Sequence, residues 1–243
     1  MVALNNLFLA VWFTLNTVVV STNSFPENVN NPELSEWWAG HQITVGQRKV
    51  PFIGKIDTRL DSYYLARFRQ TQNGVFLEQK TCATRHSKVG GVSFELDDRR
   101  TPELALMLAP NVQAEANHER NQFVGLAKVG WAEEDRDRDG HPGMTVRVDA
   151  PLCSGELYLA NQTVYQTKLN IMDSKHVQGE VSISLSMRVI DTNKLCLSLF
   201  TKDSNEQTTG VVSYRAVPAG STCDSFPVSQ WPARAYLNSP SLQ

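Results

Sequence analysis

The residues best suited to chemistry lie within positions 131–148. Three aspartates alternate there, at Asp135, Asp137 and Asp139, and the arginines between them would point away from the side on which the carboxylates converge. Calcium takes six to eight oxygen ligands, which include carboxylates and backbone carbonyls. His141 stands where a loop of this kind supplies a backbone oxygen. The spacing therefore predicts a calcium site made by the three aspartates and by His141 through its carbonyl group.

Residues 135–140, Asp-Arg-Asp-Arg-Asp-Gly, resemble the Asp-x-Asp-x-Asp-Gly loops of EF-hands, dockerins, thrombospondin type 3 repeats and integrin-propeller repeats. The longer segment, with Pro-Gly-x-Thr-Val after it, also looks like one found in secreted bacterial β proteins. Val146 replaces the usual twelfth-position glutamate, and Gly143 stands at the ninth position. The remaining ligands would come from water, from Glu133 or Glu134, or from elsewhere in the fold. The resemblance then implies a weak site, with a dissociation constant on the order of 10⁻⁴ to 10⁻³ M.

The same segment has a simpler interpretation as a solvated hairpin tip. Alternating charges keep an exposed loop soluble without any ion. We favour calcium because three alternating aspartates that end in glycine are more than solubility requires. The flanking residues have strand character, so a helix–loop–helix EF-hand is not expected.

The N-terminus predicts export. Leu7–Val20 is an uncharged apolar run, and the small polar residues Ser21–Ser24 follow it, as in a secretory signal peptide. Residues 1–23 would be removed, and 24–243 would form a single all-β domain. An uncleaved anchor is the alternative, since no Lys or Arg precedes the run. After signal removal we expect no membrane-spanning segment and an extracellular or periplasmic location.

The composition is that of an ordinary globular protein. The 243 residues carry a formal net charge of −2. Nucleic-acid binding needs a concentrated positive surface, so we expect no nucleic-acid partner. Oligomeric state does not follow from these values.

The four cysteines support export. Cys82, Cys153, Cys196 and Cys223 are widely spaced and include no Cys-x-x-Cys pair, so zinc chemistry is not expected. An oxidising compartment favours two disulfides, with three possible connectivities, over free buried thiols. Asn161-Gln-Thr163 is an N-glycosylation sequon, which has meaning only in a eukaryotic host.

The elements that must position the aspartates are strands. Alternation of apolar and polar residues, strictest over 179–190, predicts strands that are buried on one face. Further strands are expected at 90–96, 145–148, 156–165, 194–200 and 211–217. No long helices separate them, so about nine or ten sequential strands predict an all-β fold. We prefer an up-and-down, lipocalin-like barrel over a two-sheet sandwich.

Two local predictions are more detailed. Asn73-Gly74 suits a two-residue hairpin turn, which would place Arg69 opposite Glu78 and put Phe68, Val75 and Leu77 on the other face. Thr101-Pro102-Glu103 followed by an apolar run predicts a short capping helix over 101–109.

Catalysis is not indicated by any motif. The histidines are scattered, with no metalloprotease, Gly-x-Ser-x-Gly or dinucleotide-binding pattern. The sequence therefore favours a secreted β-domain with one structural calcium loop and a non-catalytic binding or surface role. A lipocalin-like carrier of a small apolar ligand is the alternative, and a secreted hydrolase with a site assembled from loops is a second one. The histidines are His41, His86, His118, His141 and His176.

Overall fold

A computed structural model describes residues 34, 36–50, 54–71, 74–87, 91–96, 101, 103–111, 122–151, 153–200 and 203–237. The signal peptide expected at residues 1–23 lies outside this range. All described strands belong to one compact unit.

The described residues form ten strands, and every paired neighbour is antiparallel. The prediction of an all-β fold is therefore confirmed. Long strands alternate apolar and polar residues, as a wall with one buried face requires. Their bounds are β1 Trp37–Val50, β2 Gly54–Thr71, β3 Gly74–His86, β4 Ser93–Leu96, β5 Leu104–Pro110, β6 Gln122–Trp131, β7 Met144–Asp149, β8 Gly155–Asp173, β9 His176–Thr192 and β10 Ser204–Ala216.

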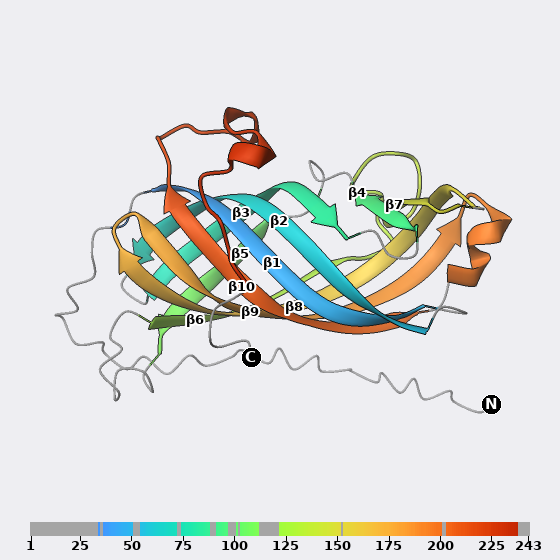
Figure 1. Cartoon of the computed structure of the whole chain (residues 1–243), viewed down its shortest axis with the longest axis horizontal. Coiled ribbons are helices and arrows are strands. Elements are labelled where there is room, and N and C mark those ends of the chain that lie inside the picture. Colours follow the sequence, from blue (N-terminus) through green and yellow to red (C-terminus); the bar gives the residue numbers. More distant parts are fainter. Residues whose placement is uncertain are drawn as a thin grey trace, which may run out of the picture. The chain divides into compact units, whose positions relative to one another are not determined.

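Eight strands close into a ring, in the order β8-β6-β5-β3-β2-β1-β10-β9 and back to β8. Within this ring each strand pairs with the ring strand that precedes or follows it in the chain, and β10 pairs with β1 to close the circle. This is an up-and-down barrel, as preferred from the sequence, and not a sandwich (Figure 1). Each ring strand therefore has a partner on both sides over at least part of its length.

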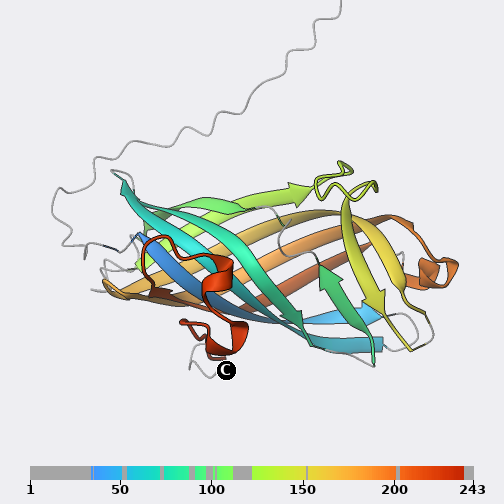
Figure 2. The ribbon, with the colours of Figure 1, turned by 90° about the horizontal axis from the view of Figure 1, so that it is seen from above.

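The wall is interrupted between β6 and β7. Both strands pair with the same edge of β8, and the last pair of β6, Trp131 with Asn161, lies next to the first pair of β7, Met144 with Leu159. Only Ala160 of β8 separates the two partners. Residues 132–143 therefore leave the wall at one point and re-enter it at the next (Figure 2).

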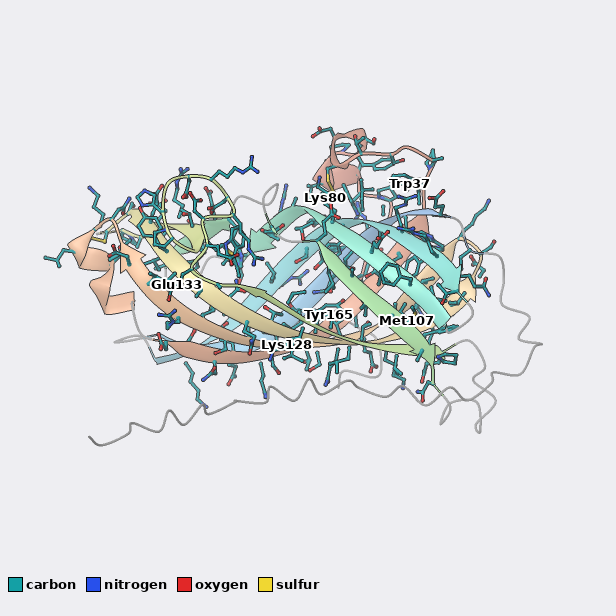
Figure 3. All side chains as sticks on the ribbon, turned by 180° about the vertical axis from the view of Figure 1, so that it is seen from behind. Trp37, Lys80, Met107, Lys128, Glu133 and Tyr165 are labelled. Carbon is teal, nitrogen blue, oxygen red and sulfur yellow. A yellow bond between two sulfur atoms is a disulfide. The ribbon has the colours of Figure 1, made fainter. Side chains whose placement is uncertain are left out.

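One half of the barrel is filled by inward-facing side chains. Tyr165 and Tyr214 are buried there, and each hydroxyl reaches across to a buried amide: Tyr165 donates to Gln42 Oε1 at 2.9 Å and Tyr214 to Gln79 Oε1 at 2.7 Å. Figure 3 shows Tyr165 within the barrel. Because a buried hydroxyl without a partner is costly, these pairs hold the interior in one arrangement. The apolar residues around them include Trp38, Phe68, Val75, Leu77, Leu108, Leu169, Val177 and Val212.

A second apolar cluster lies at the β7 end. Val146 and Val148 of β7 pack there with Leu157 and Leu159 of β8. Leu197 of the 3-10 helix η2 (Leu195–Phe200) is fully buried in the same cluster. The position of β7 therefore decides whether this cluster forms.

The β2–β3 hairpin differs from its prediction by two residues of register. Thr71 pairs with Gly74, and Glu78 lies opposite Arg67 rather than Arg69. The Arg69–Glu78 ion pair still forms, as a diagonal contact. The same side chains face inward in either register, because both place odd positions of β2 beside even positions of β3.

Two predicted elements are wrong. The helix expected over 101–109 is strand β5, in which Leu104, Leu106 and Leu108 are buried while Ala105 and Met107 are exposed. Its all-apolar run suits either period, and pairing with β3 and β6 selects the strand.

The second is the strand expected at 194–200, which is the helix η2. Residue Cys196 forms a disulfide with Cys153, and Leu195 is almost fully exposed, so this segment turns over the barrel end instead of joining its wall.

The cysteines form two disulfides, Cys82–Cys223 and Cys153–Cys196. The first ties β3 to the chain beyond β10. That chain, residues 217–237, is here called the C-terminal strap, and it includes the short 3-10 helices η3 (Cys223–Ser225) and η4 (Val228–Gln230). The sequon residue Asn161 lies within β8, where its Nδ2 contacts Met144 Sδ at 3.7 Å.

Candidate metal centre

The aspartate loop, residues 132–143, is fastened at its base. Trp131 is buried and donates from Nε1 to the Glu134 carbonyl at 3.0 Å. Gly143 donates from its backbone N to the Glu133 carbonyl at 3.1 Å, which closes the loop. A Cβ at Gly143 would lie 2.5 Å from the Leu159 carbonyl oxygen, and its φ is 78°. Glycine therefore lets the chain re-enter the wall against β8.

Two aspartates organise the loop backbone. Asp135 accepts hydrogen bonds from the backbone N of Asp139 at 3.1 Å and of Gly140 at 3.0 Å. Asp139 accepts from the backbone N of His141 at 2.9 Å and from the Thr145 hydroxyl. These bonds fold the loop inward, so that carboxylates separated by one residue in sequence point to a common centre.

The three predicted aspartates do converge. One carboxylate oxygen from each of Asp135, Asp137 and Asp139 lies within 4.8 Å of the others. Asp137 is only 5% exposed. Its Oδ2 accepts a hydrogen bond from the backbone N of Thr145 at 3.1 Å, but its buried Oδ1 has no hydrogen-bond partner. This cluster could hold a metal ion.

The pKa values of Asp135 and Asp137 are shifted in opposite directions. Desolvation, together with the nearby charge of Asp139, raises the pKa of Asp137, although the Thr145 N–H opposes this. Desolvation acts to raise the pKa of Asp135 too, but the N–H groups of Gly140 and Asp139 outweigh it, and the pKa falls below its usual value. A buried carboxylate beside two others is costly as an anion. Asp137 is therefore the position where a cation would relieve the most repulsion.

The imidazole of His141 takes no part in this convergence. Its ring stacks on Tyr158 of β8, with centroids 4.2 Å apart and an interplanar angle of 11°. The side chain therefore anchors the loop to the barrel wall. Only the backbone carbonyl of His141 stays a predicted ligand.

Glu133 and Glu134 are engaged elsewhere. Glu133 pairs with Arg188 of β9, and Glu134 Oε2 lies 2.8 Å from Arg136 Nη2. Figure 3 places Glu133 beside the loop. Further ligands would thus have to come from water or from backbone oxygens.

Thr145 was missed as a functional residue. It contacts Asp137 through its backbone and Asp139 through its hydroxyl, and it stands in the second position of β7. The Gly-x-Thr-Val pattern after the loop includes Thr145, but spacing alone does not show that the threonine folds back onto the aspartates.

One carboxylate–imidazole pair lies away from the loop. His41 Nε2 is 3.0 Å from Asp61 Oδ1, a contact that general-base catalysis often uses. The other ring nitrogen, Nδ1, accepts a hydrogen bond from the backbone N of Ala235 at 3.0 Å. Both nitrogens are occupied by the protein itself, so this pair is structural.

Comparison of the chain with protein-family models, with curated proteins and with solved structures finds no match. The likeness of the loop to known calcium-binding segments stays a prediction. In the part of the chain that the structure describes, no helix has both the length and the apolar character needed to cross a membrane.

Proposed function

We propose that this chain is an exported β-barrel domain that holds one structural calcium ion at Asp135, Asp137 and Asp139, and that it has a binding or surface role rather than a catalytic one. The main support for a metal site is the state of the Asp137 Oδ1 atom. It is a buried carboxylate oxygen without a partner, and the carboxyl group to which it belongs lies in the cluster in which one oxygen from each of the three aspartates converges within 4.8 Å. A bound cation supplies the missing partner.

Calcium suits the site better than magnesium. The donors are hard oxygens on an irregular loop, and calcium accepts such flexible geometry, whereas magnesium requires near-ideal octahedral ligands. The loop lacks the bidentate glutamate of strong sites, and both nearby glutamates are paired with arginines. Water therefore completes the shell and the affinity is low.

The proposed ion would stabilise the barrel wall where it is interrupted between β6 and β7. Asp137 and Asp139 both contact Thr145, which lies in β7. An ion that fixes these carboxylates also fixes the point at which β7 joins β8, and with it the packing of Val146 and Val148. Its effect is a more stable barrel end.

Export is supported by the two disulfides, since such bonds persist in oxidising compartments. It also agrees with the apolar N-terminal segment expected to be a signal peptide.

The decisive measurement is the melting temperature Tm during a calcium titration. At about tenfold saturation the ion stabilises the fold by about 1.4 kcal/mol, which corresponds to a rise of about 3–6 °C in a domain of this size. Replacing Asp135, Asp137 and Asp139 together by Asn should abolish the rise. Asp224→Asn, an exposed change in η3, is the matched control and should leave it intact.

Terbium gives a direct readout of occupancy. The ion replaces calcium at oxygen sites, and Trp131 at the base of the loop should sensitise its luminescence, which calcium then quenches by competition. No Tm rise at millimolar calcium, or an equal rise in the triple variant, would overturn the proposed site.

A second candidate function is carriage of a small apolar ligand. Ile183 and Leu185 of β9 face inward beyond the Tyr165 layer and are partly exposed, so side chains do not seal the barrel there. Native mass spectrometry of the purified protein tests this idea, because a carrier should retain a ligand and release it on unfolding. A ligand-free mass for every preparation would reject it.

A further inference from the structure

His41 lies where the C-terminal strap crosses the outer face of β1. The residue is 7% exposed, and its ring stacks on Tyr63 of β2, with centroids 4.6 Å apart and an interplanar angle of 5°. Nε2 contacts Asp61 Oδ1 at 3.0 Å, and Nδ1 accepts the backbone N–H of Ala235 at 3.0 Å. The imidazole thus connects two barrel strands to the strap.

This pair of contacts fixes the protonation state of His41. Nδ1 is an acceptor for Ala235, so it carries no proton, and Nε2 donates to the Asp61 carboxylate. Only the neutral ring with its proton on Nε2 satisfies both. Adding a proton to Nδ1 turns the acceptor into a donor that faces another N–H group, and the bond to the strap is lost.

The strap covers apolar residues along β1. Trp231 and Ala233 pack on Ala39, while Ala235 packs on Ile43. Trp231 also donates from Nε1 to the Gly40 carbonyl at 2.9 Å. Among the described residues beyond Trp231, the strap is joined to β1 by the hydrogen bond from Ala235 to His41.

We propose that His41 is an acid-sensitive latch: protonation of its Nδ1 releases the end of the strap, residues 231–237, and uncovers the apolar outer face of β1. The Cys82–Cys223 disulfide keeps the first part of the strap tethered to β3, so release is local and reversible. The barrel itself stays closed, because the β1–β10 and β1–β2 ladders do not involve the imidazole.

The charges that face His41 set the pH of release. Asp61 of β2 favours the protonated ring, whereas Arg59 of β2 and Arg234 of the strap disfavour it. Tyr63, which stacks on the ring, is neutral. Ser213, the partner of His41 in β10, does not titrate. Burial is the largest influence and lowers the pKa of His41, so the latch opens below the usual histidine range rather than at neutral pH.

Hydrogen exchange of the whole protein at a series of pH values from 7.5 down to 4, corrected for intrinsic rates and at constant calcium, tests the latch. The Ala235 amide and the Trp231 indole N–H should lose protection as the pH falls, by up to about tenfold per pH unit, the factor that uptake of one proton provides. Amides of β1 and β10 should keep their protection. Equal protection of the strap across this range would overturn the proposal.

Two variants separate the latch from general acid sensitivity. In His41→Asn an amide oxygen replaces Nδ1 as a non-titrating acceptor, so strap protection should no longer depend on pH. Asp61→Asn removes the charge that favours the protonated ring, so the midpoint of release should shift to lower pH. His176→Gln, a change at a histidine of β9 that pairs with Arg215 of β10 rather than with residues 231–237, should leave the midpoint unchanged. A pH-dependent loss of strap protection that persists in His41→Asn, or an unchanged midpoint in Asp61→Asn, contradicts the latch.

Discussion

Asp137 and Thr145 are joined across the break in the barrel wall: the backbone N of Thr145 donates to Asp137 Oδ2 at 3.1 Å. Asp137 belongs to the loop and Thr145 to β7, so this bond sets the register with which the strand resumes. The other oxygen of the same carboxylate is buried without a partner. One side chain therefore serves both the backbone and the proposed ion.

Asp137→Asn should have opposite effects with and without calcium. An amide keeps an oxygen to accept the Thr145 N–H but removes the buried charge, so the free energy of unfolding without calcium should stay equal or rise by about 0.5–1 kcal/mol. With saturating calcium the wild type should be the more stable protein, because the variant has lost a ligand. Urea unfolding in EDTA and in calcium measures both. The same ranking of the two proteins in both buffers would count against a metal ligand.

Gly143→Ala and Gly140→Ala form a matched pair within the loop. Both glycines have positive φ, 78° and 87°, so each alanine costs about 1–2 kcal/mol of backbone strain. A Cβ at Gly143 would also meet the Leu159 carbonyl at 2.5 Å, whereas nothing lies within 4 Å at Gly140. Overpacking should add about 1–3 kcal/mol for Gly143→Ala alone. Thermal unfolding of the two variants checks this order, and equal losses would show that the wall contact does not matter.

Local patterns in the sequence predicted most of the strands and the aspartate convergence. The alternation of apolar and polar residues, as at Val181 and Ser182, is visible within one segment, and so is the spacing of three aspartates before a glycine. Strand pairing, in contrast, depends on residues far away in the sequence. The two-residue register difference in the β2–β3 hairpin and the strand state of Leu104–Pro110 depend on which neighbouring strands are available for pairing. A run such as Leu-Ala-Leu-Met-Leu fits two periods, and only tertiary contacts choose between them.

The parts of the site that sequence did not predict are those made between distant segments. Thr145 folds back on two aspartates, and His141 stacks on Tyr158 of the following strand. Glu133 was a possible ligand by spacing, but Arg188 of β9 binds it. Cysteine pairing was open for the same reason, since sequence spacing does not report which segments meet.

Global stability should fall in acid in two separate windows. Burial lowers the pKa of His41, so the unfolded chain takes up its proton first, and stability is lost as pH falls from about 6.5 to the folded-state pKa. Desolvation acts to raise the pKa of Asp61, but hydrogen bonds from Arg59 and His41 lower it. Its contribution is present above about pH 3.9 and is lost as pH falls through the lower folded-state value.

Urea unfolding between pH 7.5 and pH 3 resolves these windows. His41→Asn should reduce the loss in the upper window and leave most of the lower one. The remaining upper part should come from His176, whose pKa burial and Arg215 also lower. An upper window that is undiminished in the double variant His41→Asn/His176→Gln would exclude histidine titration as its cause.

Tyr214→Phe tests the polar layer that fills the barrel. Tyr214 is fully buried, and its hydroxyl donates to the Oε1 atom of Gln79, which is itself 5% exposed. Removing the hydroxyl leaves that oxygen without its donor and should cost about 1–3 kcal/mol. Changing both partners, as Tyr214→Phe/Gln79→Leu, should recover part of this loss because no unsatisfied oxygen remains. Tyr236→Phe, on an exposed tyrosine of the strap, should change the free energy of unfolding by less than about 0.5 kcal/mol. A double variant whose loss equals the sum of the single losses would show that the two groups are not coupled across the lumen.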